Sequence, residues 1–158
     1  MLRVEDRLAI LEVIAQYSYT YDSCDAEGFA RLFTEDGKFE VFAPAKHAAV
    51  LCLQSQTAIN AWAAKRLAKR RGVFRSQHHQ SGTLFEELTS GSAKSRTMVL
   101  VTHQRLGEAQ PRLTLTGVYH DVWRKTPVGW RFAHRAAHVD CDPELTVQDV
   151  GISSLREG

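Results

Sequence analysis

The second half of the chain has the pattern of four long strands that follow one another in sequence. Strand-like segments span residues 74–89, 95–106, 112–126 and 129–140, and the turn-forming stretches SGS, GEAQP and TPVG lie between them. Long strands joined by such short connections form an antiparallel meander. One sheet therefore dominates the fold, and the rest of the chain must cover it.

The first half of the chain has helical periodicity instead. Acidic residues stand early in the first helical segment, where the helix dipole favours them, and Asp25 has the residue type of an N-cap for a second helix. Helices followed by a strand meander are typical of an α+β fold, and 158 residues suffice for one domain with a sizeable core. We expect helices over residues 4–23, 26–33 and 54–71, a turn and a short strand within EDGKFEVF, and a loop over 45–53.

Composition and charge argue against several classes of protein. The net charge of +2 does not favour a nucleic-acid platform. Within the basic run 65–71, Lys65, Arg66, Lys69 and Arg71 fit one solvated face of the third helix, opposite an apolar stripe that ends at Arg70. No apolar run is long enough to span a bilayer and no signal peptide begins the chain, which predicts a cytoplasmic protein without membrane partners. Cys24, Cys52 and Cys141 are widely spaced, and we expect reduced thiols that serve as small packing residues.

Asp22 is the most unusual residue of the first helical segment. Leu8, Leu11, Ala15 and Ser18 recur at three- and four-residue steps, and Asp22 continues this series. It lies about three helical turns beyond Leu11. A carboxylate on an inward-facing stripe is costly unless something pairs with it. Asp22 therefore needs a partner or a function.

Three polar residues on the predicted strands are candidates for that partnership. His78 lies on the first long strand, and Arg135 stands between Ala133 and Ala137 on one face of the fourth. His103 continues the apolar row of Val99 and Val101, on a strand whose two faces are both apolar, which predicts a central strand covered on both sides. Taken singly, each residue has an ordinary role as a core histidine or an ion-pair partner. A carboxylate beside a histidine, however, fixes the imidazole tautomer and holds the ring, as general acid/base chemistry requires.

Other chemistries find less support in the sequence. There is no GxSxG elbow, phosphate-binding loop or dinucleotide fingerprint. His78 and His79 are neighbours that point to opposite sides of a strand, so they do not ligate one metal ion. His134 and His138 share a face but lack an evident carboxylate as a third ligand. We therefore expect neither a metal nor another cofactor.

Five stretches of the chain carry a resemblance to a known family: YDSCDAEGFARLFTEDGKFEV, RSQHHQSG, LVTHQRL, GVYHDVW and GWRFAHR. In this order and spacing they resemble the SnoaL-like branch of the nuclear transport factor 2-like superfamily, and within it the scytalone dehydratases. The resemblance implies a cone-shaped, cystatin-like α+β barrel, in which a curved mixed or antiparallel sheet wraps around N-terminal helices and a deep apolar pocket. Residues 1–140 would form this single domain, and the tail 141–158 would cap the pocket.

The resemblance also implies roles for individual residues. Asp22 would orient His78, which is the acid/base, while Tyr21 and His103 would hold a water molecule or the substrate carbonyl. A dehydrochlorinase of the same superfamily has a similar Asp–His pair and adds an arginine that matches Arg135. That residue would stabilise negative charge on the substrate.

Two departures separate the chain from the dehydratases. Gly117 and Tyr119 stand where that family has a serine and an asparagine, and an aliphatic residue near Val41 replaces a second pocket tyrosine. The acid/base residues are thus retained while the residues that contact the substrate differ. The dehydratase substrate is therefore not carried over.

These observations together predict a cofactor-independent lyase of the dehydratase kind, acting on a small cyclic or aromatic hydroxy-carbonyl compound. A ketosteroid-isomerase-like isomerase or cyclase, a non-catalytic ligand-binding module and an oxygenase subunit that supports a metal-bearing partner are the alternatives. The family further implies a homo-oligomer, dimer or trimer, joined through the outer face of the sheet.

Overall fold

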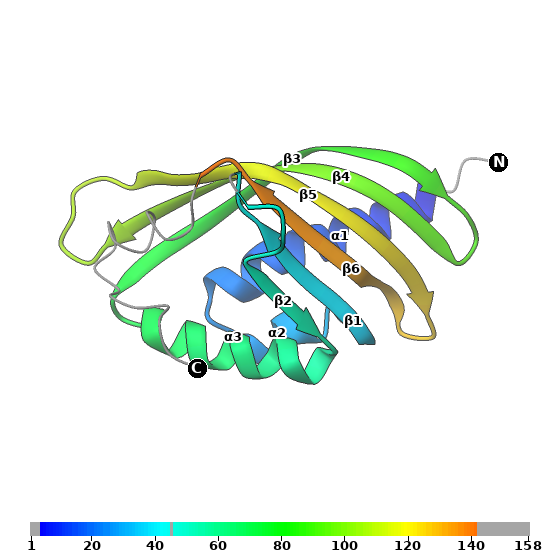
Figure 1. The fold of residues 1–158 in the computed structure, drawn as a ribbon, viewed down its shortest axis with the longest axis horizontal. Helices are drawn as coiled ribbons and strands as arrows, with labels where there is room; N and C mark the ends of the chain where they lie inside the picture. The colour runs from blue at the N-terminus through cyan, green and yellow to red at the C-terminus, as the bar shows by residue number, and fades with distance from the viewer. Residues whose placement is uncertain (1–3, 45, 142–158) are drawn as a thin grey trace.

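The computed structural model describes residues 4–44 and 46–141 and shows a curved sheet with helices on one side (Figure 1). The sheet has six strands in the order β2-β1-β6-β5-β4-β3. All neighbours pair antiparallel except β1 and β6, which run parallel. The expected α+β fold with a curved mixed sheet is therefore confirmed. The elements are α1 (Val4–Asp22), α2 (Ala26–Ala30), β1 (Phe33–Phe42), β2 (Leu51–Gln54), α3 (Gln56–Arg70), β3 (Phe74–Leu88), β4 (Ser92–Arg105), β5 (Arg112–Thr126) and β6 (Gly129–Val139).

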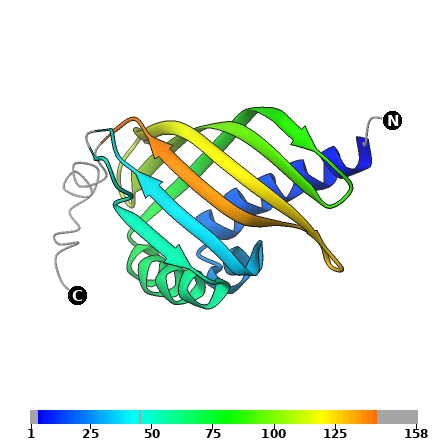
Figure 2. The ribbon, with the colours of Figure 1, turned by 45° about the vertical axis from the view of Figure 1, so that its right-hand side comes forward.

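The helices cover one face of the sheet along different strands. α1 packs on β3 and β6, whereas α3 lies against β1 and β2. The short helix α2 packs on both α1 and α3. Figure 2 shows the long strands arching past α1. The C-terminal end of α1 lies close to both β3 and α3, since Asp22 bonds to His78 of β3 and Tyr21 to Arg66 of α3.

Two element boundaries differ from the sequence prediction. α2 ends at Ala30 and β1 begins at Phe33, so the EDG stretch lies within a strand and not in a turn. β1 accommodates it through a register shift between Phe33 and Lys38 in its pairing with β6. β2 occupies Leu51–Gln54, largely inside the expected loop, because these residues pair antiparallel with β1. Both strands form by pairing with other segments, which local periodicity does not report.

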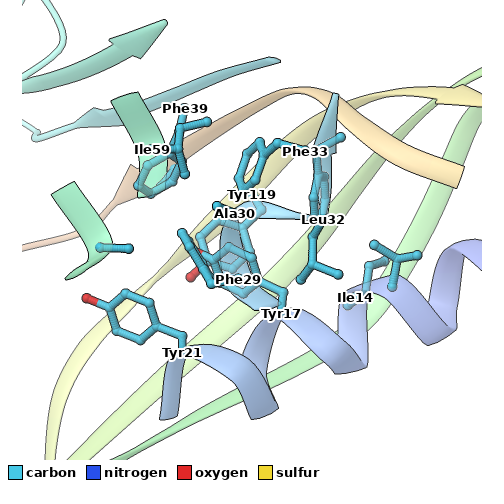
Figure 3. Packing of buried hydrophobic residues seen from close by; sticks show 14 of the residues in the cluster. Ile14, Tyr17, Tyr21, Phe29, Ala30, Leu32, Phe33, Phe39, Ile59 and Tyr119 are labelled. Carbon is cyan, nitrogen blue, oxygen red and sulfur yellow. The ribbon is translucent and has the colours of Figure 1, made fainter. Parts of the chain in front are cut away.

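The buried face of α1 is not the stripe expected from the sequence. Leu8 and Leu11 are 61% and 39% exposed, so the stripe that continues to Asp22 points largely to solvent. Large side chains turn inward instead, because they bury more apolar area. Asp22 follows Tyr21 at the edge of the buried face, and Figure 3 shows Tyr21 near Phe29 in the aromatic core. The buried side chains of α1 are Asp6, Ile10, Val13, Ile14, Tyr17 and Tyr21.

The strand β4 lies inside the sheet, but the described chain covers only one of its faces. Val99 and Val101 are buried, whereas Met98 and Leu100 on the opposite face are 55% and 38% exposed. The expectation that both faces are covered is thus wrong within one chain, because the described helices lie on the same side of the sheet. The homo-oligomer joined through the outer face stays a prediction.

The remaining expectations about the chain have mixed outcomes. All three cysteines carry free thiols, but Cys52 is exposed and so does not serve as a packing residue. None of the described helices is long and apolar enough to cross a membrane. The predicted cap over the pocket, residues 141–158, lies outside the described residues except for its first position.

Candidate active site

Asp22 and His78 form a close pair between the end of α1 and β3. The Oδ1 atom of Asp22 accepts a hydrogen bond from His78 Nδ1 at 2.7 Å, and Oδ2 accepts one from the backbone N–H of His78 at 2.8 Å. Burial disfavours the carboxylate, but its hydrogen bonds to His78 and Ser76 outweigh burial and hold the pKa of Asp22 below its usual value. An ionised carboxylate only accepts, so Nδ1 carries a proton, and in the neutral imidazole Nε2 then keeps its lone pair. Nε2 makes no hydrogen bond within the described residues.

Two further residues hold the Asp22 carboxylate in place, and sequence reasoning missed both contacts. Ser76 Oγ donates to Asp22 Oδ1 at 2.6 Å, and Arg70 Nη2 donates in turn to Ser76 Oγ. Ser76 and Arg70 are each 4% exposed. Ser76 shares a strand face with His78, and Arg70 ends the apolar stripe of α3, so periodicity indicates that both point inward. Their hydrogen bonds depend on tertiary contacts that periodicity does not report.

Tyr21 lies edge-on to the His78 ring, with 4.9 Å between the ring centroids. Its hydroxyl oxygen accepts a hydrogen bond from Arg66 Nε at 2.8 Å, and the Arg70 guanidinium carbon lies 4.6 Å from the ring centroid. Burial raises the pKa of the Tyr21 phenol, but the two guanidinium groups outweigh burial and leave that pKa below its ordinary value. The expectation that Arg66 lies on the solvated face of α3 is wrong. Its side chain is partly buried because it reaches this phenol.

His103 lies on β4 opposite Ser76 of β3. Its ring packs on Phe74 with 4.8 Å between centroids, and its Nδ1 is buried without a hydrogen-bond partner among the described residues. Burial, together with the nearby guanidinium charges of Arg70 and Arg66, lowers the pKa of His103 to about 4. The ring is therefore neutral at pH 7 and presents one N–H donor and one acceptor.

Arg135 lies in the core, one aromatic layer away from the Asp22–His78 pair. Its Nε and Nη2 donate to the two carboxylate oxygens of Asp121 at 2.8 and 2.9 Å, and both side chains are fully buried. Burial disfavours the guanidinium charge, but Asp121 outweighs burial and raises the pKa of Arg135. The Tyr17 ring separates it from the pair, at 4.2 Å from the guanidinium carbon and 6.3 Å from the His78 ring. The charge of Arg135 is therefore balanced inside the protein.

The described residues contain no group of three or more His, Cys, Asp or Glu side chains placed to hold a metal ion. His134 does have a carboxylate neighbour, Glu40, whose Oε2 lies 2.8 Å from the ring Nε2, and the sequence did not indicate this contact. His138 instead stacks on Phe42, with 4.7 Å between ring centroids. The two histidines therefore have separate partners.

The residues of this cluster fall within a region that corresponds to a known family. The family model described as a SnoaL-like domain matches residues 2–136. The chain belongs to the SnoaL-like domain family. The matched region includes every residue of the Asp22–His78 cluster and also Arg135. Among proteins of curated function, no sequence matches the chain.

Solved structures similar to this SnoaL-like protein differ in function. A protein of unknown function from Mycobacterium tuberculosis is 29% identical, with a TM-score of 0.68 over 84% of this chain and 75% of that chain. A candidate scytalone dehydratase from Novosphingobium aromaticivorans is 26% identical, with a TM-score of 0.69 over 86% and 85%. The beta subunit of a candidate aromatic-ring-hydroxylating dioxygenase from the same organism is 20% identical, with a TM-score of 0.73 over 89% and 92%, and shows the fold alone. That fold is the nuclear transport factor 2-like, cystatin-like fold, which does not by itself decide an activity.

Proposed function

We propose that the protein is a cofactor-independent lyase that removes water from a small cyclic or aromatic hydroxy-carbonyl compound. The observation that carries the proposal is the pair of hydrogen bonds from His78 to the Asp22 carboxylate, which leaves Nε2 of an oriented imidazole unbound. A general base needs this arrangement. The similarity to a candidate scytalone dehydratase supports the reaction class.

The elimination uses His78 first as a base and then as an acid. Nε2 takes a proton from the carbon beside the substrate carbonyl, and the electrons of the C–H bond move into an enolate. The imidazolium then gives that proton to the hydroxyl group on the next carbon. The C–O bond breaks, water leaves, and the enolate electrons form the new double bond, so His78 ends neutral. Positioned acid/base groups of this kind contribute about 10²–10⁴-fold in rate.

Tyr21 and His103 are proposed to hold the carbonyl oxygen while it becomes an enolate. The Tyr21 oxygen accepts its hydrogen bond from Arg66, so its own O–H is available as a donor. Neutral His103 offers one ring N–H. Arg135 lies behind Tyr17 and its charge is balanced by Asp121, so it has no direct part in the proposed reaction. Preorganised donors and charges are commonly the largest single contribution to enzyme catalysis.

A screen for water loss tests this proposal. A panel of cyclic β-hydroxy ketones and phenolic alcohols would be mixed with the protein, and the conjugated product followed by its absorbance. Turnover should disappear in His78→Ala and fall about a hundredfold or more in Asp22→Asn. His79→Ala changes an exposed histidine on the opposite strand face and should keep full activity. Turnover that survives in His78→Ala would overturn the assignment.

An isomerase is the second function that the same geometry favours. The free Nε2 that starts an elimination also starts the shift of a double bond, since both begin with removal of a proton beside a carbonyl group. β,γ-Unsaturated ketones therefore belong in the same panel. Their conversion to conjugated isomers, with no water loss from the hydroxy ketones and no activity in His78→Ala, would identify the isomerase.

A further inference from the structure

Two guanidinium groups of α3 stand beside the acid/base pair without a carboxylate bound directly to them. Arg66 uses Nε on the Tyr21 hydroxyl, and Arg70 uses Nη2 on the Ser76 hydroxyl. Neither forms an ion pair with a described residue, and Arg70 Nε is buried without a hydrogen-bond partner there. Arginine side chains withdrawn from water are ordinarily paired, because an unpaired buried charge is costly. The unpaired cations therefore indicate an anionic ligand.

The Arg66 side chain extends toward the acid/base pair. Its Nε bonds to the phenol of Tyr21, whose ring lies edge-on to His78. Burial has the largest effect on the pKa of Tyr21 on α1 and of His103 on β4, and the Arg66 charge lowers both pKa values. Lys65, the preceding residue of α3, is exposed by contrast. Arg66 is thus the cation of this helix segment that a bound ligand would meet together with His78.

The balance of charge and the free donors favour a carboxylate. Arg66 and Arg70 bring two positive charges against the single negative charge of Asp22, so one negative charge on a ligand balances the three groups, whereas a dianion would exceed the balance. Nη1 and Nη2 of Arg66 make no hydrogen bond to the described residues. A guanidinium with two free donor nitrogens binds a carboxylate through two parallel hydrogen bonds.

The surroundings of Arg66 indicate the skeleton that carries this carboxylate. The Trp62 ring lies 5.7 Å from the Arg66 guanidinium carbon, and its centroid lies 6.3 Å from that of Tyr21 and 5.6 Å from that of Phe39. Trp62 is only partly buried, so part of its surface remains available. Flat rings pack well on such aromatic neighbours.

We infer that the site takes a monocarboxylate on a flat aromatic or cyclic skeleton, with the carboxylate on Arg66 and the reacting carbons at His78. The position of the reacting carbons rests on the proposed function, whereas the carboxylate position rests on the charges, free donors and aromatic neighbours of Arg66 and does not depend on the reaction. The substrate class narrows accordingly, from hydroxy-carbonyl compounds in general to those that also carry a carboxylate.

Binding of naphthoate and of its neutral counterpart naphthamide tests the inference by isothermal titration calorimetry. Wild type should bind naphthoate at least about tenfold more tightly than naphthamide, because one charge-assisted hydrogen bond contributes about that factor in affinity. Arg66→Met should lose this preference, and Arg66→Lys should keep part of it. Lys65→Met removes the same charge from the exposed face of α3 and should leave the preference unchanged. Arg66→Gln keeps a donor toward Tyr21 and serves as a second neutral variant.

Equal binding of the two ligands, no binding of either, or a preference that survives in both folded neutral variants would overturn the inference. Naphthoate carries no hydroxyl leaving group, so its binding does not depend on catalysis, and His79→Ala, at an exposed position of β3, should bind it as wild type does. Arg66-dependent binding without water loss across the panel would uphold the carboxylate site and oppose the lyase. Water loss that needs His78 but occurs equally well with neutral ketones and in Arg66→Met would uphold the lyase and oppose the carboxylate site.

Discussion

The buried pair of Arg135 and Asp121 leads to a quantitative prediction of stability. Asp121→Asn keeps the size of the side chain but removes the charge that balances Arg135. Both side chains are 0% exposed, so the guanidinium would stay in the core without a counter-ion. Removal of one partner from a buried ion pair costs about 3–5 kcal/mol. At about 2–4 °C per kcal/mol for a chain of this size, Tm should fall by roughly 6–20 °C.

Calorimetry and urea titration of three variants measure this effect and separate it from the loss of a surface charge. Asp36→Asn removes the same charge from an exposed pair with Arg124 and should leave Tm nearly unchanged. Joint replacement by Asp121→Leu and Arg135→Met should recover most of the loss, because an apolar pair of similar size suits the same core. A loss below about 1 kcal/mol in Asp121→Asn would refute the reasoning, since it would equal that of an exposed pair.

Two further predictions concern the candidate site. Ser76→Ala removes the hydroxyl between Arg70 and Asp22 and leaves a buried donor unpaired. Urea titration should therefore show a loss of about 1–3 kcal/mol in the free energy of unfolding. Ser81→Ala, at an exposed position of β3, is the control, and an equal loss in both variants would contradict the role of Ser76. The pKa of His103 is about 4 in the folded protein against an ordinary 6.5. The unfolded chain therefore binds more protons between these values, and stability should fall as the pH drops from 6.5 toward 4. His103→Gln should make that fall shallower, and an unchanged slope in urea titrations would oppose a buried neutral His103.

Periodicity in the sequence predicts the elements whose patterns are long and regular. The four strands after Phe74 and the helices α1 and α3 lie within a few residues of their expected bounds. β2 and the parallel pairing of β1 with β6 escape prediction because they depend on other segments of the chain. The inward stripe of α1 was wrong because Leu8 and Leu11 compete with a second apolar series that contains larger side chains. Propensity and period do not decide between two such stripes.

The same distinction holds for the candidate site: local patterns predict some of its residues, and the others depend on tertiary contacts. Family motifs place Asp22 and His78 together, and the structure brings both to the junction of α1 and β3. Arg66 was missed because a basic run on a helix is typical of a solvated face, and no local pattern reveals that one side chain turns in to reach a phenol. The sequence did not indicate that Arg70 bonds to Ser76 and Ser76 to the Asp22 carboxylate, since these three residues lie on three different elements.

Exchange of α-protons in heavy water tests most directly whether His78 removes a proton beside a carbonyl group. A cyclic ketone without a leaving group, such as α-tetralone, cannot lose water, so NMR spectroscopy follows the proton transfer alone. The account predicts accelerated exchange with wild type and with His79→Ala, and the uncatalysed rate with His78→Ala. Exchange that continues undiminished in His78→Ala, or no acceleration by the wild-type protein, would contradict it.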